Sequence, residues 1–237
     1  MKTLKTYEIK IINKILKNEG GYVYDKNDLG GETYRGISRR YFPDFKGWKI
    51  IDSFKSQKDY LISSDLNKLN LSSELIFLNK LVFEFYKKEF LDKSKINDQG
   101  IHEDIIYTII DFGVNIGSKR SIKYAQKASE SYPDGIPGPK TRKALKDFSE
   151  DNKRTLFLLR FSKLKYNFYL DNIKKRPKNK KYIKGWFNRI NKILDETLIN
   201  LKYIEVLPEM FKDSDCFEEI NKEVKEIKNI LDNFYYN

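Results

Sequence analysis

Hydrophobic residues recur along most of this chain at the spacing of an α-helix. In the segment 7–17 the apolar side chains fall at positions 9, 11, 12, 15 and 16, which places them on one side of a helix. Gly20-Gly21 follows as a C-terminal stop. The same spacing predicts further helices at 56–67, 73–91, 101–116, 118–132, 140–148, 153–174, 182–201 and 217–234.

One stretch departs from this helical pattern. Tyr22-Val23-Tyr24 and Thr33-Tyr34-Arg35 have strand character, and Asn27-Asp28 with Gly30-Gly31 supply turn residues between them. This is the one convincing β signal in the sequence. We therefore predict a mostly α, α+β fold: a helical bundle with one short β-hairpin.

Two segments interrupt the pattern strongly enough to suggest boundaries. The run Pro133–Pro139 is the densest loop signal, and a second gap lies near Lys93–Gly100. We predict an N-terminal lobe at 1–98 that carries the hairpin, a helical lobe at 99–203 and a helical extension at 204–237. A cleft between the two lobes, beside the hairpin, is where a ligand is expected.

Composition narrows the function classes. The 46 Lys and Arg residues exceed the 34 Asp and Glu residues, and the net charge of +12 favours polyanionic partners. A solvated, Lys-rich surface explains the same charge equally well, because acids are interleaved with the bases. Cys216 and His102 are each the single residue of their type, which excludes an internal disulfide and leaves His102 as a surface or capping residue. No metal site and no cofactor are expected.

The N-terminus and the hydropathy pattern bear on location. The first residues lack the apolar core of a signal peptide, and no long uncharged apolar run indicates a transmembrane helix. We therefore expect synthesis in the cytoplasm without a signal peptide and no integral membrane segment.

The candidate chemistry lies in the hairpin region. Glu19 stands where the first helix ends, and Asp28 and Thr33 follow within fourteen residues. Cleavage of a glycosidic bond needs a carboxylic acid to protonate the leaving oxygen and a second polar group to place water or steady the cation. Glu19 would be the general acid, with its pKa raised by burial. Asp28 equally suits a turn, and Asp25 is another candidate for the second carboxylate.

Four segments in order resemble the glycoside hydrolase 108 family, the N-acetylmuramidases of phage endolysins and bacterial secretion activator proteins. They cover roughly residues 7 to 200. The four segments are Glu19-Gly20-Gly21-Tyr22-Val23 with Asp28-x-Gly30-Gly31-x-Thr33-x-x-Gly36-Ile37; Asp111-Phe112-x-x-Asn115-x-Gly117; Asp134-Gly135-x-x-Gly138-Pro139-x-Thr141, which resembles the family's peptidoglycan-binding region; and Gly185-Trp186-x-x-Arg189. Lys26 and Leu29 stand where the family usually has proline. These departures remove turn rigidity but no chemical group.

The resemblance implies a lysozyme-like fold and site roles. By similarity to T4-type phage lysozymes, Asp28 would be the base that orients water and Thr33 would hydrogen-bond the same water. A Glu19–Asp28 separation of ~6.5–9.5 Å would give inversion, and ~5 Å retention. The remaining candidates are substrate-binding residues: Tyr22, Tyr34, Asp111, Asn115 and Trp186. Packing is the alternative role for the three aromatic residues, and helix capping is the alternative for Asn115. Arg189, close to Trp186, would pair either with a cell-wall carboxylate or with a core acid.

The resemblance also implies a function and partners. The expected activity is hydrolysis of the β-1,4 bond between N-acetylmuramic acid and N-acetylglucosamine, with peptidoglycan glycan strands as the partner. The alternatives are a lytic transglycosylase and a non-catalytic cell-wall-binding protein. We expect a monomer, no nucleic-acid partner, and action in the periplasm or cell wall after passage through a holin or a dedicated secretion machinery.

Overall fold

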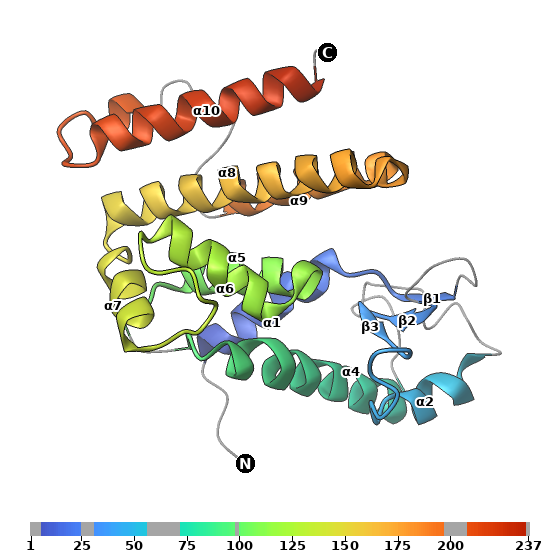
Figure 1. Cartoon of the computed structure of the whole chain (residues 1–237). Helices are drawn as coiled ribbons and strands as arrows, with labels where there is room; N and C mark the ends of the chain where they lie inside the picture. Colours follow the sequence, from blue (N-terminus) through green and yellow to red (C-terminus); the bar gives the residue numbers. More distant parts are fainter. Residues whose placement is uncertain (1–5, 25–30, 56–71, 98–99, 197–207, 236–237) are drawn as a thin grey trace. The chain divides into compact units, whose positions relative to one another are not determined.

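The computed structural model describes residues 6–24, 31–55, 72–97, 100–196 and 208–235. Within these ranges the chain is mostly helical with one small antiparallel sheet, which confirms the predicted fold class. The chain divides into two compact units, Met1–Lys93 and Ser94–Asn237 (Figure 1). The helix predicted at 56–67 lies outside the described residues.

The first unit contains the sheet and a small set of helices. Its elements are α1 (Thr6–Asn18), β1 (Tyr22–Tyr24), β2 (Glu32–Tyr34), β3 (Ile37–Ser38), α2 (Trp48–Ser53), α4 (Ser73–Tyr86) and the π-helix η3 (Lys87–Asp92). The short helix α2 and the change from α- to π-helix within the predicted segment 73–91 were not expected. The helices α1 and α4 each bury one apolar stripe, as the apolar spacing in 7–17 and 73–91 indicates.

The core of this unit combines aliphatic and aromatic side chains. From α1 it takes Ile11, Ile12, Ile15 and Leu16, and from α4 it takes Leu75, Leu78, Val82 and Tyr86. Burying each aliphatic side chain contributes roughly 1.5–3 kcal/mol. The amino end of α1 is joined to η3 by an ion pair, in which Lys87 Nζ lies 3.3 Å from Oε1 of the buried Glu8. Burial opposes the charge of Lys87, but Asp92 and Glu8 raise its pKa.

The sheet has three antiparallel strands in the order β1-β2-β3. Tyr22 pairs with Tyr34 and Val23 with Thr33 across β1 and β2, and Tyr34 pairs with Ile37 across β2 and β3. The predicted hairpin is therefore the first two strands of a meander, and its segment 22–37 also contains the start of a third strand.

The second unit is entirely helical in its described part. Its elements are α5 (Glu103–Ile116), α6 (Ser118–Ala128), α7 (Pro139–Asp147), α8 (Asp151–Lys175), the 3-10 helix η4 (Pro177–Tyr182), α9 (Ile183–Glu196), the 3-10 helix η6 (Pro208–Phe211) and α10 (Phe217–Tyr235). Most of the basic segment Arg176–Lys181 therefore lies in the 3-10 helix η4. His102 is the N-cap of α5, where its Nδ1 accepts a hydrogen bond from the Asp104 amide at 3.2 Å.

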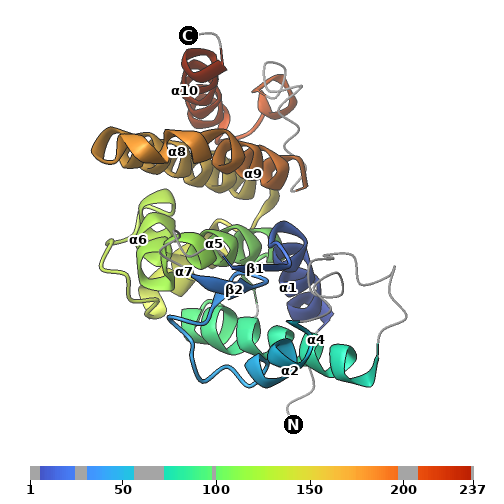
Figure 2. The same ribbon diagram turned by 90° about the vertical axis from the view of Figure 1, so that its right-hand side faces the viewer.

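This unit is built in layers around α5. Residues 104–113 of α5 are all buried, which a helix shows when neighbours cover every side. Figure 2 shows α5, α6 and α7 grouped beneath α8 and α9. On the other side of α8 lies α10, whose buried stripe is Ile220, Val224 and Ile227. Lys163 of α8 fixes the pair by contacting Glu223 at 2.6 Å and Glu226 at 2.9 Å. The C-terminal extension therefore packs as part of this unit.

None of the helices in the described ranges combines the length and apolar character that a bilayer span needs.

Candidate active site

Glu19 stands at the point where α1 ends. Its backbone amide donates to Leu16 O at 3.4 Å, which closes the last turn of the helix, and Gly20-Gly21 then leads the chain into β1. The side chain of Glu19 is half-buried. The helix end thus fixes the backbone of Glu19 while the side chain stays partly accessible.

The carboxylate of Glu19 lies against the turn between β2 and β3. Arg35 and Gly36 form this two-residue turn with φ angles of 47° and 75°, the left-handed pair of a type I′ hairpin. A Cβ atom built on Gly36 would lie 2.6 Å from Glu19 Oε2 and 2.6 Å from the hydroxyl oxygen of Tyr86. Because Gly36 has no side chain, the carboxylate of Glu19 can occupy this space.

Two hydrogen bonds hold this turn in place. The Arg35 amide donates to Gly21 O at 3.1 Å, and the buried Tyr86 hydroxyl donates to Arg35 O at 2.7 Å. The first bond ties the turn to the segment just after Glu19, and the second ties it to the end of α4. Tyr86 thus positions the turn, although in the sequence it is only one residue of the predicted helix 73–91.

Among the predicted partners of Glu19, Thr33 lies in the centre of β2, half-buried and paired with Val23 and Ser38. Asp28 and Asp25 lie outside the described residues. Thr33 and the Glu19 turn belong to the same three-stranded sheet, because Gly36 follows β2 directly.

The two predicted tyrosines differ in environment. Tyr34 is buried; burial raises the pKa of its phenol, and the charge and hydrogen bond of Arg35 oppose that rise. Tyr22 is half-buried and donates to Glu32 Oε1 at 3.1 Å. Burial and this bond raise the pKa of Tyr22. Tyr34 thus packs in the core, while Tyr22 retains partial exposure.

A charged cluster anchors β2 to the region of α2. Glu32 pairs with Arg39 at 3.1 Å and Lys55 at 2.8 Å, and both cations also contact Asp52 at 2.7 Å. Burial alone would raise the pKa of Asp52, but Arg39 and Lys55 hold it below its usual range. The cluster fixes the strand on which Thr33 lies.

The other predicted residues belong to the second unit. Asp111 is buried and takes a forked hydrogen bond from Arg189, with Nη2 at 2.7 Å from Oδ1 and Nε at 3.1 Å from both oxygens. Arg189 therefore pairs with a core acid. Asn115 is exposed and its amide donates to Asp111 O at 3.0 Å. Trp186 is half-buried and stacks on Tyr169 with ring centres 4.5 Å apart.

The third motif, which begins at Asp134, forms an ordered loop between α6 and α7. The buried Gln126 donates to Asp134 Oδ1 at 2.7 Å, Thr141 Oγ1 at 3.0 Å and Ile136 O at 3.1 Å, and accepts from the Gly135 amide at 2.7 Å. Gln126 gave no signal in the sequence, since nothing in a glutamine on an amphipathic helix shows that a loop closes over it.

These groups define what the site can do. Glu19 offers a carboxyl group held by a helix end, a left-handed turn and a tyrosine, as general acid catalysis needs. Among the described residues, no three His, Cys, Asp or Glu side chains gather closely enough to hold a metal ion. Among the described residues, the site thus consists of the carboxyl group of Glu19 and the sheet whose strand β2 carries Thr33.

Two family models match successive segments of this chain. Residues 12–117 match the family model described as Glycosyl hydrolase 108, and residues 121–191 match that described as a Predicted Peptidoglycan domain. The structure of Brucella abortus SagA is similar in fold, with a TM-score of 0.54 and 19% sequence identity over 82% of this chain and 95% of that chain. No curated protein matches.

These matches also support the broad activity. A glycoside hydrolase segment followed by a peptidoglycan domain indicates a peptidoglycan hydrolase, with peptidoglycan as its ligand. Glu19 and the turn against which it lies both fall inside the first matched segment. Residues 12–117 therefore match the glycosyl hydrolase 108 family, and residues 121–191 match a predicted peptidoglycan domain.

Proposed function

We propose that this protein is a lysozyme-type N-acetylmuramidase, which hydrolyses the β-1,4 bond between N-acetylmuramic acid and N-acetylglucosamine in peptidoglycan. The observation that carries the proposal is the position of the Glu19 carboxylate, which lies over Gly36 in the β2–β3 turn. A half-buried acid held by backbone geometry suits a proton donor better than a solvated helix-end glutamate would.

Glu19 acts as general acid in this mechanism. The glycosidic oxygen is a poor leaving group until it is protonated, so the acid must deliver its proton as the C–O bond breaks. Proton transfer by a positioned side chain contributes typically 10²–10⁴-fold to the rate. The type I′ turn and the Tyr86 hydroxyl fix the surface against which the carboxylate rests.

Water attack supplies the second half of the reaction. Asp28 is proposed as the carboxylate that takes a proton from water, and Thr33 as a hydrogen-bonding partner of that water. Thr33 lies on β2, one residue before Tyr34 and three before Gly36, so the same sheet carries both the acid's support and the proposed water site. The water oxygen becomes the new hydroxyl at the anomeric carbon of N-acetylmuramic acid.

Clearing of purified peptidoglycan by wild type and Glu19→Gln tests the proposal. Gln keeps the size of the side chain but cannot donate the proton, so the variant should lose at least ~100-fold in rate. Its circular dichroism and unfolding midpoint should match those of wild type. Asp28→Asn and Thr33→Val measured in parallel should each lower the rate without abolishing binding to sacculi.

Mass spectrometry of the released fragments decides between related activities. Hydrolysis gives reducing N-acetylmuramic ends. A lytic transglycosylase would instead give 1,6-anhydro ends, lighter by one water, because the 6-hydroxyl of the muramic residue attacks in place of water. If wild type and Glu19→Gln bind sacculi equally and neither cuts, the chain is a wall-binding protein and the proposal is wrong.

A muramidase must reach the wall to act. Passage through a holin-type pore or a dedicated secretion machinery, and action as a monomer, stay predictions of this function. Fractionation during lysis or secretion tests the first: protein that remains in the cytoplasm throughout would contradict it. Light scattering of the purified protein tests the second.

A further inference from the structure

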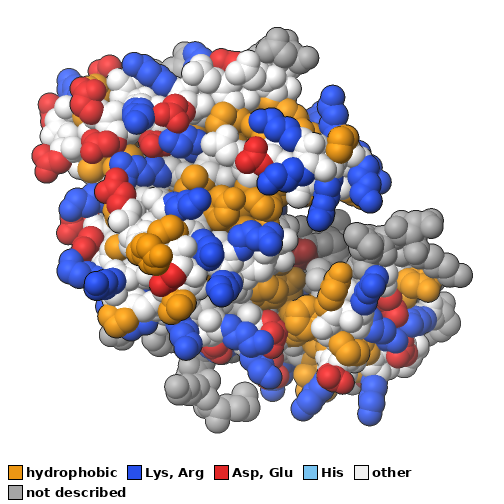
Figure 3. All heavy atoms as spheres, viewed as in Figure 1, with side chains coloured by type: hydrophobic (Ala, Val, Ile, Leu, Met, Phe, Trp, Pro, Cys, Tyr) orange, Lys and Arg blue, Asp and Glu red, His pale blue; other side chains and the backbone are white. Residues whose placement is uncertain are grey.

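The surface formed by α6, α7 and the loop between them is strongly basic. Residues 118–147 contain eight Lys and Arg residues against three Asp and Glu residues. Figure 3 shows Lys and Arg side chains, with hydrophobic ones among them, over the region where Figure 1 places α6 and α7. Neither the proton donor nor its supporting turn uses this surface.

Three lysines of α6 form a row. Lys119, Lys123 and Lys127 are exposed and are spaced four residues apart, so they project from one side of the helix, with successive lysines about 6 Å apart along its axis. Helix α6 contains no acidic residue. The row therefore presents a line of positive charge to solvent.

The nearby acids already have cationic or hydrogen-bonding partners. Glu130 pairs with Arg160 at 2.8 Å, and Asp147 pairs with Lys143 at 2.6 Å. Asp134 accepts bonds from the Ile136 amide and from Gln126, both at 2.7 Å. The first of these is the largest cause of the lowered pKa of Asp134, to which the charge of Lys123 also contributes. Among the acids in 118–147, each carboxylate is thus engaged away from Lys119 and Lys127.

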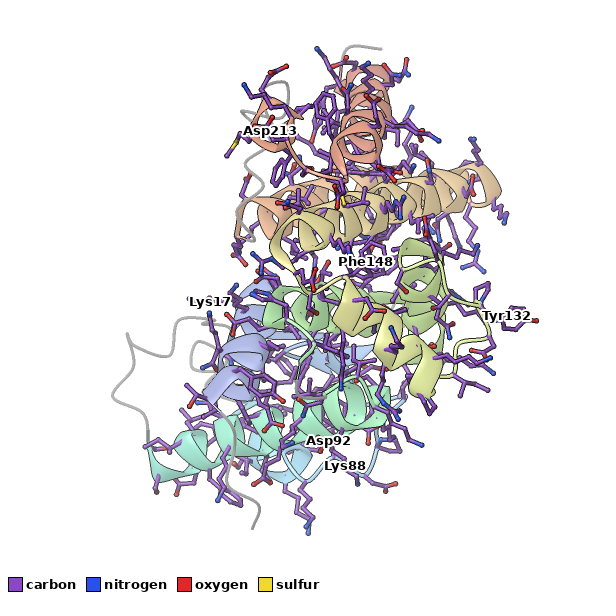
Figure 4. The ribbon with its side chains drawn as sticks, turned by 90° about the vertical axis from the view of Figure 1, so that its left-hand side faces the viewer. Lys17, Lys88, Asp92, Tyr132, Phe148 and Asp213 are labelled. Atoms are coloured by element: carbon purple, nitrogen blue, oxygen red, sulfur yellow. The ribbon has the colours of Figure 1, made fainter. Side chains whose placement is uncertain are left out.

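An apolar feature stands beside the row. Tyr132 is 82% exposed and Ile136 is 62% exposed, on the loop that Gln126 fixes. Figure 4 shows the Tyr132 ring pointing away from the protein. Gly135 brings the loop against α6, since a Cβ built there would lie 2.8 Å from Lys119 O and 3.1 Å from Lys123 Cγ. The loop therefore holds two exposed apolar side chains next to a line of lysines.

We propose that Lys119, Lys123, Lys127, Tyr132 and Ile136, the α6–α7 face, bind the peptide stems of peptidoglycan. Carboxylates of the stems would pair with the lysines, and their alanine methyl groups would contact Tyr132 and Ile136. The proposal rests on the proposed function, because it names the part of that substrate which this face takes. A phosphodiester wall polymer would satisfy the lysines but offers less for two exposed apolar side chains to contact.

Sedimentation with purified sacculi measures the binding, in a Glu19→Gln background and on ice. Lys119→Gln, Lys123→Gln and Lys127→Gln together should weaken binding about tenfold, since exposed ionic contacts are individually weak. Tyr132→Ala should weaken it severalfold. The control variant, Lys212→Gln with Lys222→Gln and Lys225→Gln, removes the same charge from other exposed positions of the second unit and should bind as the parent does.

The sacculi are then changed chemically. Amidation of the stem carboxylates should weaken binding of the parent to the level of the α6 triple variant. Hydrofluoric acid extraction, which removes phosphodiester polymers, should leave binding unchanged. Loss of binding on extraction alone would show a phosphodiester ligand and overturn the proposal. Equal weakening by the control triple, which would mean non-specific attraction, or no weakening by the α6 triple would overturn it too.

Failure of the proposed function gives a different result. If wild type does not cut peptidoglycan, sedimentation still reports whether the α6–α7 face binds the stems. If wild type cuts and the α6 triple variant binds normally, the muramidase proposal stands and the binding face is wrong. Cleavage of short soluble glycans without stems should be equal in wild type and the α6 triple variant.

Discussion

Gly36 allows the Glu19 carboxylate its position because it has no side chain. Its φ of 75° is a conformation that favours glycine, and the space above it is filled by Glu19 Oε2 and the Tyr86 hydroxyl. Since the atoms that a methyl group would meet are the ends of side chains, they can move aside. A substitution here should therefore displace the carboxylate while the fold survives.

Gly36→Ala is expected to lower peptidoglycan cleavage about 100-fold, because a misplacement of about 1 Å costs an enzyme on that order. Unfolding in urea should show a loss of about 1 kcal/mol from the left-handed backbone. Gly31→Ala is the matched control: Gly31 has a φ of 61° and nothing within 4 Å of an added Cβ. It should lose similar stability and keep most of its activity. Equal activity in the two variants would contradict the role assigned to Gly36.

At the residue scale, the sequence predicts positions only where a local pattern determines them. The position of Glu19 at a helix end follows from a helical pattern that ends in two glycines. The bond from Tyr86 to Arg35 joins residues 51 positions apart, and the forked pair of Asp111 with Arg189 joins residues 78 apart. No local sequence pattern predicts contacts between residues so far apart. Asp111 therefore looked like a binding residue when its carboxylate is in fact engaged in the core.

At the scale of elements, the α6–α7 loop shows how a turn is made rigid. Gly135 has a φ of 79°, and an added Cβ would meet the backbone oxygen of Lys119 at 2.8 Å. Backbone cannot move aside as a side chain can. The four hydrogen bonds of Gln126 then fix the loop from within the helix.

Gly135→Ala should destabilise the second unit by about 2 kcal/mol, from the left-handed backbone and the overlap with α6. Gly138→Ala provides the comparison, because Gly138 has a φ of −72° and open space around an added Cβ. That variant should stay within about 0.5 kcal/mol of wild type. Urea unfolding and amide exchange at 134–138 measure the effect. Equal destabilisation by both substitutions would show that the loop is not held as described.

The helices themselves were largely predictable, because amphipathic spacing fixes both their period and their buried side. Their interruptions were not. The π-helix at Lys87–Asp92 continues the apolar pattern of α4 without a break in sequence, and Pro177–Tyr182 reads as a polar linker although it forms a 3-10 helix. Only the neighbours packed against these segments decide their backbone form.

At the scale of the whole molecule, the two tryptophans report on different units. Trp48 is buried in the first unit, where its indole donates to Phe42 O at 2.8 Å, and Trp186 lies in the second. With Trp48→Phe as background, fluorescence follows the second unit alone. The stability of the second unit can thus be measured in the intact chain.

The second unit contains a buried amine that its sequence did not reveal. Lys165 of α8 is 2% exposed, donates to Thr108 Oγ1 at 3.4 Å, and lies over the rings of Phe112 and Phe161. Burial lowers the pKa of Lys165 from 10.5 to about 8; Asp111 opposes this and Arg189 adds to it. From the sequence alone, a lysine among basic and aromatic residues on a long helix is expected to be exposed to solvent. Only the packing shows that Lys165 is buried.

This pKa predicts a pH-dependent stability. Between pH 8 and 10.5 the unfolded chain holds the Lys165 proton and the folded chain does not, so raising the pH stabilises the folded state. The gain across this window is about 3 kcal/mol, and below pH 8 the folded state bears the full cost of a buried charge. The direction is opposite to that of a lysine stabilised by a carboxylate.

Lys165→Met removes the amine whose titration makes the stability depend on pH. In the Trp48→Phe background, the variant should be more stable than its parent at pH 7, since the thioether fills similar volume without a charge to bury. The difference between variant and parent should shrink as the pH rises toward 10.5, because all other titrating groups are common to both. Urea unfolding at several pH values measures it. A difference that stays constant with pH would mean that Lys165 keeps an ordinary pKa in the folded protein, and the charged amine would then have to be stabilised inside the second unit.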